Sequence, residues 1–439
     1  MTDAPAKPHR VVIVGAGFGG LEAAFGLAGA PVEITLIDRR NHHLFQPLLY
    51  QVATASLATS EIAWPIRYLL RDRKEVTTLF ATVIGIDAKG KHVLLEDGDA
   101  IPYDTLVLAT GARHAYFGHD EWEPFAPGLK TIQDALEIRR RILLAFELAE
   151  RQANSEKEQV QLNFVVVGGG PTGVELAGTM AEIARKALSN EFRTIDPRKT
   201  RIVLLEGGPR VLPAYPEDLS RSAEEQLKRL GVEVHTSAMV TLVTPGAVHM
   251  GDTPLPAAVI LWAAGVAASP LGKKLGGPVD RAGRVAVNPD LSLPGHPEVF
   301  VIGDLATLKD ENGKMLPGVA PVAMQEGKAT AHNIAADLRG EPRKNFHYFN
   351  KGNLATIGRA AAVAEFGKIH ISGFLAWLAW LFVHVFFLIG FRNRIIVLVQ
   401  WAWSYFTYER GARLITGDTH LPGWDELRAE KGKVHNAAD

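Results

Sequence analysis

Short apolar runs that end at or near glycine alternate with helical stretches over the first 330 residues. The runs are rich in valine, isoleucine and leucine, which is typical of parallel strands buried on both faces. The alternation predicts an α/β, doubly wound fold. The runs are VVIVGAG (11–17), VEITLID (32–38), TLVLATG (105–111), NFVVVGGG (163–170), RIVLLEGG (201–208), AVILWAAG (258–265) and EVFVIGD (298–304).

The pattern changes at three places along the chain. Residues 75–104 alternate more strongly and contain Asp97-Gly98, which predicts an antiparallel hairpin or meander inserted in the first domain. A polar helical stretch near 131–160 leads into the second glycine motif and marks a domain boundary. After about residue 345 the pattern changes and predicts helices and a long apolar stretch, and the last 30 residues are polar.

Composition removes several classes of function. The 47 basic and 48 acidic residues leave a net charge of −1, so a nucleic-acid partner is not expected. The chain has no cysteine, which excludes disulfides, thiolate metal sites and cysteine redox catalysis. No metal-ligand spacing occurs, so no metal is expected. The first apolar run is already a strand before a glycine turn, so we expect no signal peptide and a cytoplasmic main body.

Two glycine motifs, 153 residues apart, predict two dinucleotide cradles. Gly15, Gly17 and Gly20 fit G-x-G-x-x-G between a strand and a helix, and Asp38 ends the next strand. The first glycine permits the tight turn, the second lets the pyrophosphate approach, and the third lets helix and strand pack. The helix N-terminus then favours the pyrophosphate, and Asp38 is placed to bind ribose hydroxyls. The alternative is a glycine-rich turn without a ligand.

The second motif has Gly168, Gly170 and Gly173, with Glu206 ending a strand 33 residues later. This gap exceeds the usual one of about 20 residues, and a longer helix and loop account for it. A carboxylate here should repel a 2′-phosphate, so NADH is favoured over NADPH. Glu206 could instead be an ordinary charged strand end. Two cradles imply FAD and a nicotinamide cofactor, an arrangement that passes hydride from nicotinamide to flavin.

Residues 372–394, SGFLAWLAWLFVHVFFLIGFRNR, differ from the rest of the chain. No formally charged residue lies between Ile369 and Phe391, and a second uncharged stretch runs from 395 to 408. Tryptophan and tyrosine favour the headgroup level of a bilayer, and the two stretches hold Trp377, Trp380, Trp401, Trp403, Tyr405 and Tyr408. As one helix, residues 374–391 would reach about 27 Å, which permits a single span. A buried core helix or a dimer seam is the alternative.

The order of the motifs resembles the type II NADH dehydrogenases, single-chain NADH:quinone oxidoreductases that contain FAD. The resemblance covers residues 10–415 and rests on GAGFGG, HHLFQPLLYQVA, LVLATGAR, GGGPTGVELAG, LLEGGPRVLP, WAAGV, VFVIGDLA, GVAPVAMQEGK and WLFVHVFFLIGFRNR. It implies two Rossmann-like domains, for FAD (1–130 and 276–345) and NADH (131–275), and a C-terminal helical membrane-anchoring and quinone-access region (346–439). It also implies a homodimer.

The resemblance assigns roles to individual residues. Its FAD site comprises Gly15, Ala16, Gly17, Gly19 and Gly20 at the pyrophosphate, Asp38 at the ribose, Thr110, Gly111, Gly303 and Asp304 along the cofactor, and Gln46, Pro47 and Leu48 near the isoalloxazine. Ala264 and Gly265 would lie beside NADH, and Glu175 where nicotinamide and flavin meet. A carboxylate in a partly apolar site can have a raised pKa, so Glu175 is the candidate proton relay, or else it positions NADH.

The quinone segment departs from the family pattern. The family often carries Ala-Gln-x-Ala-x-Gln, but here Ala320 is followed by Pro321, and the segment ends in Met324 and Gln325. Any contact by the first amide is therefore absent. Gln325 could face flavin or quinone, or bond to backbone.

The absence of cysteine means that the electron acceptor must meet the flavin directly. We expect ubiquinone or menaquinone, with residues 372–408 as a monotopic anchor on the cytoplasmic face of the inner membrane. His384 within the anchor is expected to be a hydrogen-bonded helix residue. The alternatives are a soluble flavoprotein reductase of the ferredoxin or rubredoxin type and a membrane-docked NADH sensor.

Overall fold

The computed structural model describes residues 7–156, 161–388, 391–407 and 411–435. Tyr408, one of the anchor aromatics, lies outside the described residues. The chain divides into two compact units, each built from three segments. The first unit comprises residues 1–44, 63–113 and 266–350, and the second comprises 45–62, 114–265 and 351–439. The expected domain boundaries at 130, 275 and 345 divide the chain by the cofactor that each segment is predicted to bind. The two compact units divide it by contacts, so these boundaries remain predictions.

The first unit is built on a six-stranded sheet in the order β20-β21-β9-β1-β2-β5. Strands β21, β9, β1 and β2 are parallel to one another, as their apolar runs predicted, and β5 is parallel to β2. Strand β20 at the edge is antiparallel to β21. Alternate side chains of β1 enter two different cores: Val11 and Ile13 pack with one cluster, and Val12 and Val14 with the other. Both faces of the sheet are therefore buried, which explains why its strands read as continuous apolar runs.

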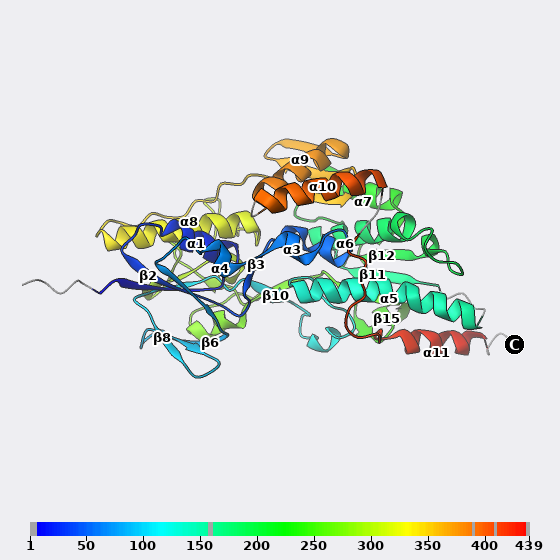
Figure 1. Cartoon of the computed structure of the whole chain (residues 1–439), viewed down its shortest axis with the longest axis horizontal. Coiled ribbons are helices and arrows are strands. Elements are labelled where there is room, and N and C mark those ends of the chain that lie inside the picture. The colour runs from blue at the N-terminus through cyan, green and yellow to red at the C-terminus, as the bar shows by residue number, and fades with distance from the viewer. Residues whose placement is uncertain (1–6, 157–160, 389–390, 408–410, 436–439) are drawn as a thin grey trace, which may run out of the picture. The chain divides into compact units, whose positions relative to one another are not determined.

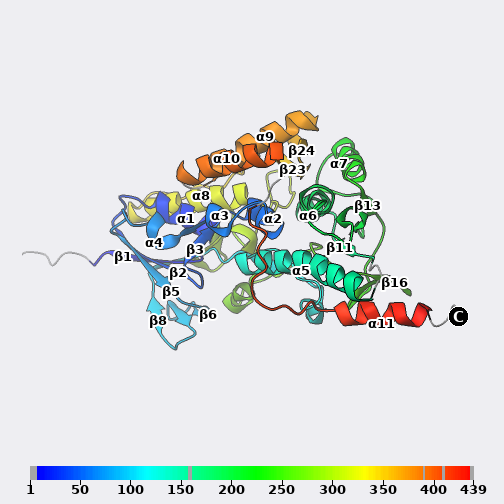
Figure 2. The same ribbon diagram turned by 45° about the vertical axis from the view of Figure 1, so that its right-hand side comes forward.

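Helices α1 (Phe18–Gly26) and α8 (Ala320–Leu338) lie side by side over one face of this sheet (Figures 1 and 2). They approach closely because Gly327 has no side chain: a Cβ there would lie 2.3 Å from the carbonyl oxygen of Gly19. Strands β6, β7 and β8 form the antiparallel meander predicted within residues 75–104, and Gly98 takes the left-handed conformation (φ +96°) at its turn. The first part of that segment was predicted wrongly, because β5 pairs with β2 in the parallel sheet.

The bounds of the first unit's elements are β1 (His9–Val14), β2 (Val32–Asp38), β3 (His42–Leu44), β4 (Ala63–Pro65), α4 (Ile66–Leu69), β5 (Val76–Phe80), β6 (Val83–Asp87), β7 (His92–Leu95), β8 (Ala100–Pro102), β9 (Thr105–Leu108), β10 (Ala112–His114, whose last residue begins the second unit), β18 (Val266–Ala268), η5 (Pro270–Leu275), β19 (Val285–Ala286), β20 (Ser292–Leu293), β21 (His296–Val301), η6 (Gly303–Leu305) and β22 (Ala306–Thr307).

The second unit contains a parallel four-stranded sheet in the order β13-β12-β11-β17. Helix α6 (Pro171–Glu182) follows β11 and begins with proline, which suits the first helical turn because its missing N–H would have no partner there. Helix α5 (Ile132–Glu156) is the helix expected near 131–160, and it lies on the opposite side of the sheet from α6 (Figure 2).

A C-terminal module completes this unit. Strands β23, β24 and β25 form an antiparallel sheet that carries α9 (Phe374–Phe387), and α10 (Phe391–Thr407) lies beside α9 (Figures 1 and 2). Gly178 of α6 meets this sheet so closely that a Cβ would lie 1.6 Å from the carbonyl oxygen of Ile357. One continuous helix over 374–391 does not form, because Leu388 is extended and ends α9. None of the helices in the described part of the chain is both long enough and apolar enough to cross a bilayer.

The bounds of the second unit's elements are η1 (Gln46–Leu48), α2 (Leu49–Ala53), α3 (Thr59–Ile62), η2 (Asp120–Trp122), β11 (Asn163–Val167), η3 (Ile183–Ala187), η4 (Pro197–Lys199), β12 (Arg201–Leu205), α7 (Glu217–Arg229), β13 (Val232–His235), β14 (Leu242–Thr244), β15 (Ala247–Met250), β16 (Thr253–Pro256), β17 (Val259–Trp262), β23 (Asn353–Gly358), β24 (Ala361–Phe366), β25 (Ile369–Ser372) and α11 (Trp424–His435).

Candidate functional site

The first glycine loop connects β1 to α1 and has the geometry that its three glycines predict. Gly15 has φ +103°, and a Cβ on it would lie 2.4 Å from the carbonyl oxygen of Ala109. A Cβ on Gly20 would lie 1.8 Å from the carbonyl oxygen of Gly15. Gly17 is different, because no protein atom lies within 4 Å of the Cβ position there. The loop is thus closed against its own sheet and open at Gly17, just before the helix N-terminus.

Asp38 is tied to this loop. Its Oδ2 accepts the N–H of Ala16 at 2.7 Å, and its Oδ1 accepts the N–H of Arg40 at 2.7 Å. His43 holds the same loop from another side, since its Nδ1 donates to the carbonyl oxygen of Ala16 at 3.0 Å. Burial lowers the pKa of His43, which favours a neutral imidazole. The carboxylate is therefore fixed at the loop's edge, with lone pairs left for a further donor.

The second loop, between β11 and α6, repeats this geometry. Gly168 has φ +108°, a Cβ on Gly173 would lie 1.8 Å from the carbonyl oxygen of Gly168, and Gly170 has open space. Glu206 accepts the N–H of Gly169 through Oε2 and that of Gly208 through Oε1, both at 2.6 Å. The 33 residues between Gly173 and Glu206 therefore leave the geometry of the loop unchanged, because Glu206 still follows the neighbouring strand.

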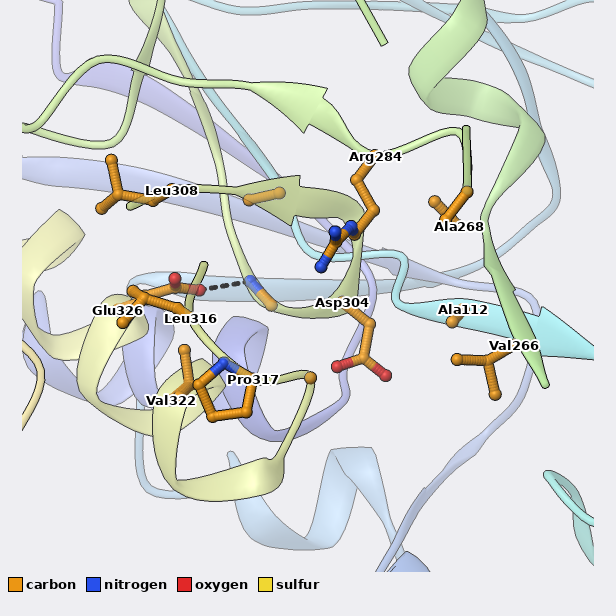
Figure 3. A pocket seen from close by; sticks show the side chains of 14 residues that line it. Ala112, Val266, Ala268, Arg284, Asp304, Leu308, Leu316, Pro317, Val322 and Glu326 are labelled. Carbon is orange, nitrogen blue, oxygen red and sulfur yellow. Dashed lines mark hydrogen bonds between the residues drawn. The ribbon is translucent and has the colours of Figure 1, made fainter. Parts of the chain in front are cut away.

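A cavity of about 210 Å³ lies in the first unit (Figure 3). Gly303 and Asp304, which the resemblance placed along a cofactor, line it together with Arg284, Val322 and Glu326. Glu326 is almost completely buried, with 2% of its surface exposed, and its Oε2 accepts the N–H of Gly303 at 2.5 Å. Glu326 lies in the quoted motif GVAPVAMQEGK but was given no role there, and Arg284 lies in none of the quoted motifs, so neither was expected to contribute to a site.

Two glutamines that the sequence placed near the flavin or the quinone form hydrogen bonds with backbone groups. Gln46 is exposed and donates from Nε2 to the carbonyl oxygen of Lys130 at 3.2 Å. Gln325 uses both ends of its amide on Phe349: Nε2 donates to the carbonyl oxygen at 3.0 Å and Oε1 accepts the N–H at 2.9 Å. This is the backbone-bonded alternative for Gln325. Pro321 lies in the first turn of α8, where a missing N–H costs no hydrogen bond.

Glu175 lies on α6, one turn after the second loop. Its side chain is half-buried, and burial raises its pKa well above the ordinary value, although the N–H of Thr356 acts in the opposite direction. A protonated carboxyl near neutral pH is the state that a proton donor requires. Gly265 lies under the ring of Phe117, so that a Cβ on Gly265 would lie 2.6 Å from that ring.

The C-terminal helices turn their polar residues inward, which sequence reasoning missed. Asn393 is 1% exposed and donates to the carbonyl oxygens of Ser60 (3.1 Å) and Glu61 (2.8 Å). Gln400 donates to the Glu61 carboxylate, and Trp401 donates to Oε1 of Gln51 at 2.8 Å. These bonds fasten α10 to residues 45–62. His384 donates from Nδ1 to the carbonyl oxygen of Trp380 at 2.7 Å, as expected of a helix residue.

The outward face of the same helices is apolar. Its exposed large side chains are Phe374, Leu375, Leu378, Phe382 and Phe386 on α9, and Ile395, Leu398, Val399, Trp403 and Phe406 on α10. We call these ten residues the apolar face. Exposed apolar clusters of this kind mark interaction sites for proteins or membranes.

Two family models match the chain in succession. Residues 9–327 match the pyridine nucleotide-disulphide oxidoreductase model, and residues 350–408 match the NDH2 C-terminal domain. Two Mycobacterium tuberculosis proteins are similar over almost the whole chain. The type II NADH:quinone oxidoreductase NdhA is 47% identical, with 93% of this chain and 89% of NdhA covered. The type II NADH:quinone oxidoreductase Ndh is 46% identical, with 98% and 96% covered.

This chain is a type II NADH:quinone oxidoreductase family member. The fold agrees: the structure of NDH2 from Plasmodium falciparum in complex with NADH matches with a TM-score of 0.82 at 21% identity, covering 94% of this chain and all of that one. The first model's name refers to disulphides, but this family member has no cysteine and therefore no redox disulphide of its own. The NDH2 C-terminal model covers β23–β25, α9 and α10, which include the apolar face.

The first unit of this family member fits a flavin dinucleotide. The space at Gly17 admits a pyrophosphate to the N-terminus of α1. The hydroxyl of Thr110 is buried without a hydrogen-bond partner in the described part of the chain, so a ligand there would satisfy it. Gly303 and Asp304 line a cavity in the same unit. A narrow cradle, an unsatisfied buried hydroxyl and a cavity are what an extended cofactor needs.

Alanine substitutions at the two open glycines separate cofactor binding from folding. Gly17→Ala should leave the melting temperature of the flavin-free protein unchanged, because no protein atom is near the new methyl group. The methyl group would fill the pyrophosphate space, so bound flavin should fall by roughly tenfold or more. Gly170→Ala should keep the flavin and raise KM for NADH instead. Absorbance at the flavin band and steady-state kinetics check both. Normal flavin content in Gly17→Ala would contradict the assignment.

Proposed function

We propose that this chain binds FAD in the first unit and NADH in the second, and that it oxidises NADH and reduces a membrane quinone without pumping protons. The observation that carries the function is 46–47% identity, over nearly all of the chain, to type II NADH:quinone oxidoreductases. The geometry supports it, because both glycine loops keep the open position at which a pyrophosphate can approach. Bound FAD supplies the redox chemistry: it accepts a hydride and passes on two electrons.

The chain's own residues hold and orient the two dinucleotides. In this proposal the N–H groups at the N-termini of α1 and α6 bind the pyrophosphates, and Asp38 and Glu206 accept ribose hydroxyls. Each carboxylate is already fixed by two backbone N–H groups, so little side-chain entropy remains to be lost on binding. The negative charge of Glu206 would repel a 2′-phosphate, which selects NADH over NADPH.

We assign the proton relay for quinol formation to Glu175. Burial raises its pKa and so favours the protonated carboxyl, and Glu175 lies one turn from the second glycine loop. Because the protonated form is the donor, quinone reduction should weaken as the pH rises through that pKa. Gln325 and Pro321 line the quinone segment in this proposal, although the amide of Gln325 is already engaged by Phe349.

Reoxidation of the reduced holoenzyme tests both the function and the relay. Under anaerobic conditions NADH should bleach the yellow protein, and a menaquinone or ubiquinone analogue should restore its colour. Glu175→Gln should slow the restoration by about a hundredfold, since a positioned proton donor contributes about that much. Restoration by ferricyanide, which takes electrons without protons, should be unaffected. Glu217→Gln, at an exposed position in the first turn of α7, is the control. Colour restored only by a redox protein would overturn the function, and an unchanged quinone rate in Glu175→Gln would overturn the relay.

We further propose that the apolar face docks the chain on the cytoplasmic side of the cell membrane, where quinone is available. Phe382 and Phe386 stand one turn apart on α9 and are 70% and 59% exposed. Trp403 on α10 adds an aromatic ring of the kind that favours the headgroup level. Large aromatic side chains that are this exposed contribute the most binding free energy when they leave water for an apolar phase.

Co-sedimentation with lipid vesicles tests the docking. The double substitution Phe382→Ser and Phe386→Ser should weaken binding by roughly a hundredfold, because two phenyl groups lose their burial in the lipid. The matched control is Phe80→Ser and Ile84→Ser, which removes two exposed apolar side chains from the first unit. Equal loss in both double variants, or no loss in the first, would show that the apolar face does not bind the bilayer.

A homodimer is also proposed, and it rests on the family resemblance. Light scattering of the detergent-solubilised holoenzyme should then give a protein mass of about twice the 47.7 kDa of one chain. A mass equal to one chain at micromolar concentration would count against the dimer.

A further inference from the structure

Glu326 is a buried acid that the proposed mechanism does not use. It projects from α8 into the cavity of the first unit, with its carboxyl directed at the backbone of Gly303 (Figure 3). Gly303 has φ +70°, a left-handed conformation, and it opens the short helix η6 that carries Asp304. The Glu326–Gly303 hydrogen bond therefore ties α8 to the loop that presents Asp304 to the cavity.

The surroundings of Glu326 disfavour its charged form. Burial raises the pKa of Glu326 to about 8; the N–H of Gly303 opposes this shift, and the negative charge of Asp304 adds to it. The only cation lining the cavity in the described part of the chain is Arg284, which is paired with Asp280 at 2.7 Å. On the two packed helices, Glu22 of α1 and Lys328 of α8 pair with each other at 3.6 Å.

A dinucleotide entering this unit is itself an anion, because its pyrophosphate carries two negative charges at neutral pH. An ionised Glu326 would add a negative charge at a position that is 2% exposed, where repulsion is weakly screened. A protonated Glu326 adds no charge, and its carbonyl oxygen can still accept the N–H of Gly303. The geometry of the loop is then kept while the repulsion disappears.

We propose that FAD binding by this chain is coupled to protonation of Glu326, which acts as a positioning residue: the neutral carboxyl holds the Gly303 loop and admits the cofactor, and its ionisation releases the cofactor. This rests on the proposed assignment of FAD to the first unit. The sign follows from linkage. FAD retention is full below the pKa of Glu326 and falls as the pH rises through it. Above that pKa Glu326 is ionised in the FAD-free protein, so binding FAD takes up a proton there.

Release of FAD from the purified holoenzyme tests the coupling without measuring activity. The protein is held at a series of pH values on both sides of 8, and free FAD is measured by its fluorescence after ultrafiltration. In the unsubstituted protein the dissociation constant should rise above that pH by up to about tenfold per pH unit. Glu326→Gln keeps an acceptor oxygen but cannot ionise, so its profile should be flat, and it should hold FAD more tightly than the unsubstituted protein at alkaline pH.

Two further variants make the result specific. Glu326→Asp keeps a titratable carboxyl and should restore the pH dependence. Glu341→Gln, which removes an exposed acid just beyond α8, should behave like the unsubstituted protein. A flat profile in the unsubstituted protein overturns the coupling, as does a pH-dependent profile in Glu326→Gln or failure of that variant to hold FAD at any pH. Purified protein that carries no flavin at all would instead overturn the proposed function.

Discussion

One interaction organises both halves of the molecule: a carboxylate at the end of a strand accepts an N–H from the glycine loop at the end of the neighbouring strand. Asp38 does this to Ala16, and Glu206 does it to Gly169. The parallel register brings the two strand ends together, so the acid can reach the backbone of the loop. A loop held in this way keeps its open glycine free of protein atoms. Cofactor binding depends on that space more than on any single side chain.

The two cradles share this frame and differ in the acids beyond it. Burial raises the pKa of Glu326 in the first unit and that of Glu175 in the second, and the consequences differ. Glu326 is bonded to the backbone of a cofactor loop, so its charge bears on which ligand the loop holds. Glu175 is only half-buried, and an acid that reaches the surface can exchange its proton with a substrate or water. Thiol or disulphide chemistry of the protein takes part in neither unit, since the chain contains no cysteine.

The C-terminal module inverts the usual distribution of polar and apolar residues. Asn393 and Gln400 face inward and bond residues 45–62, whereas phenylalanine, leucine and tryptophan side chains face outward. In water this arrangement costs free energy on the outer face of the helices, where apolar surface stays hydrated. It also costs free energy on the inner face, where polar groups must find buried partners. The arrangement becomes favourable when the outer face leaves water. The few inward bonds then serve to fix the orientation of the helices.

Features governed by local sterics could be derived from the sequence alone. The glycine loops, the strand-end acids and the meander turn at Gly98 each depend on residues close along the chain or on strand order. Features governed by contacts between distant segments could not. Glu326 meets Gly303 across 23 residues, and Trp401 meets Gln51 across 350. The break between α9 and α10 was hidden as well, because an uncharged run looks the same whether it forms one helix or two. Tertiary packing decided these features, since a buried polar group takes whatever partner the fold brings to it.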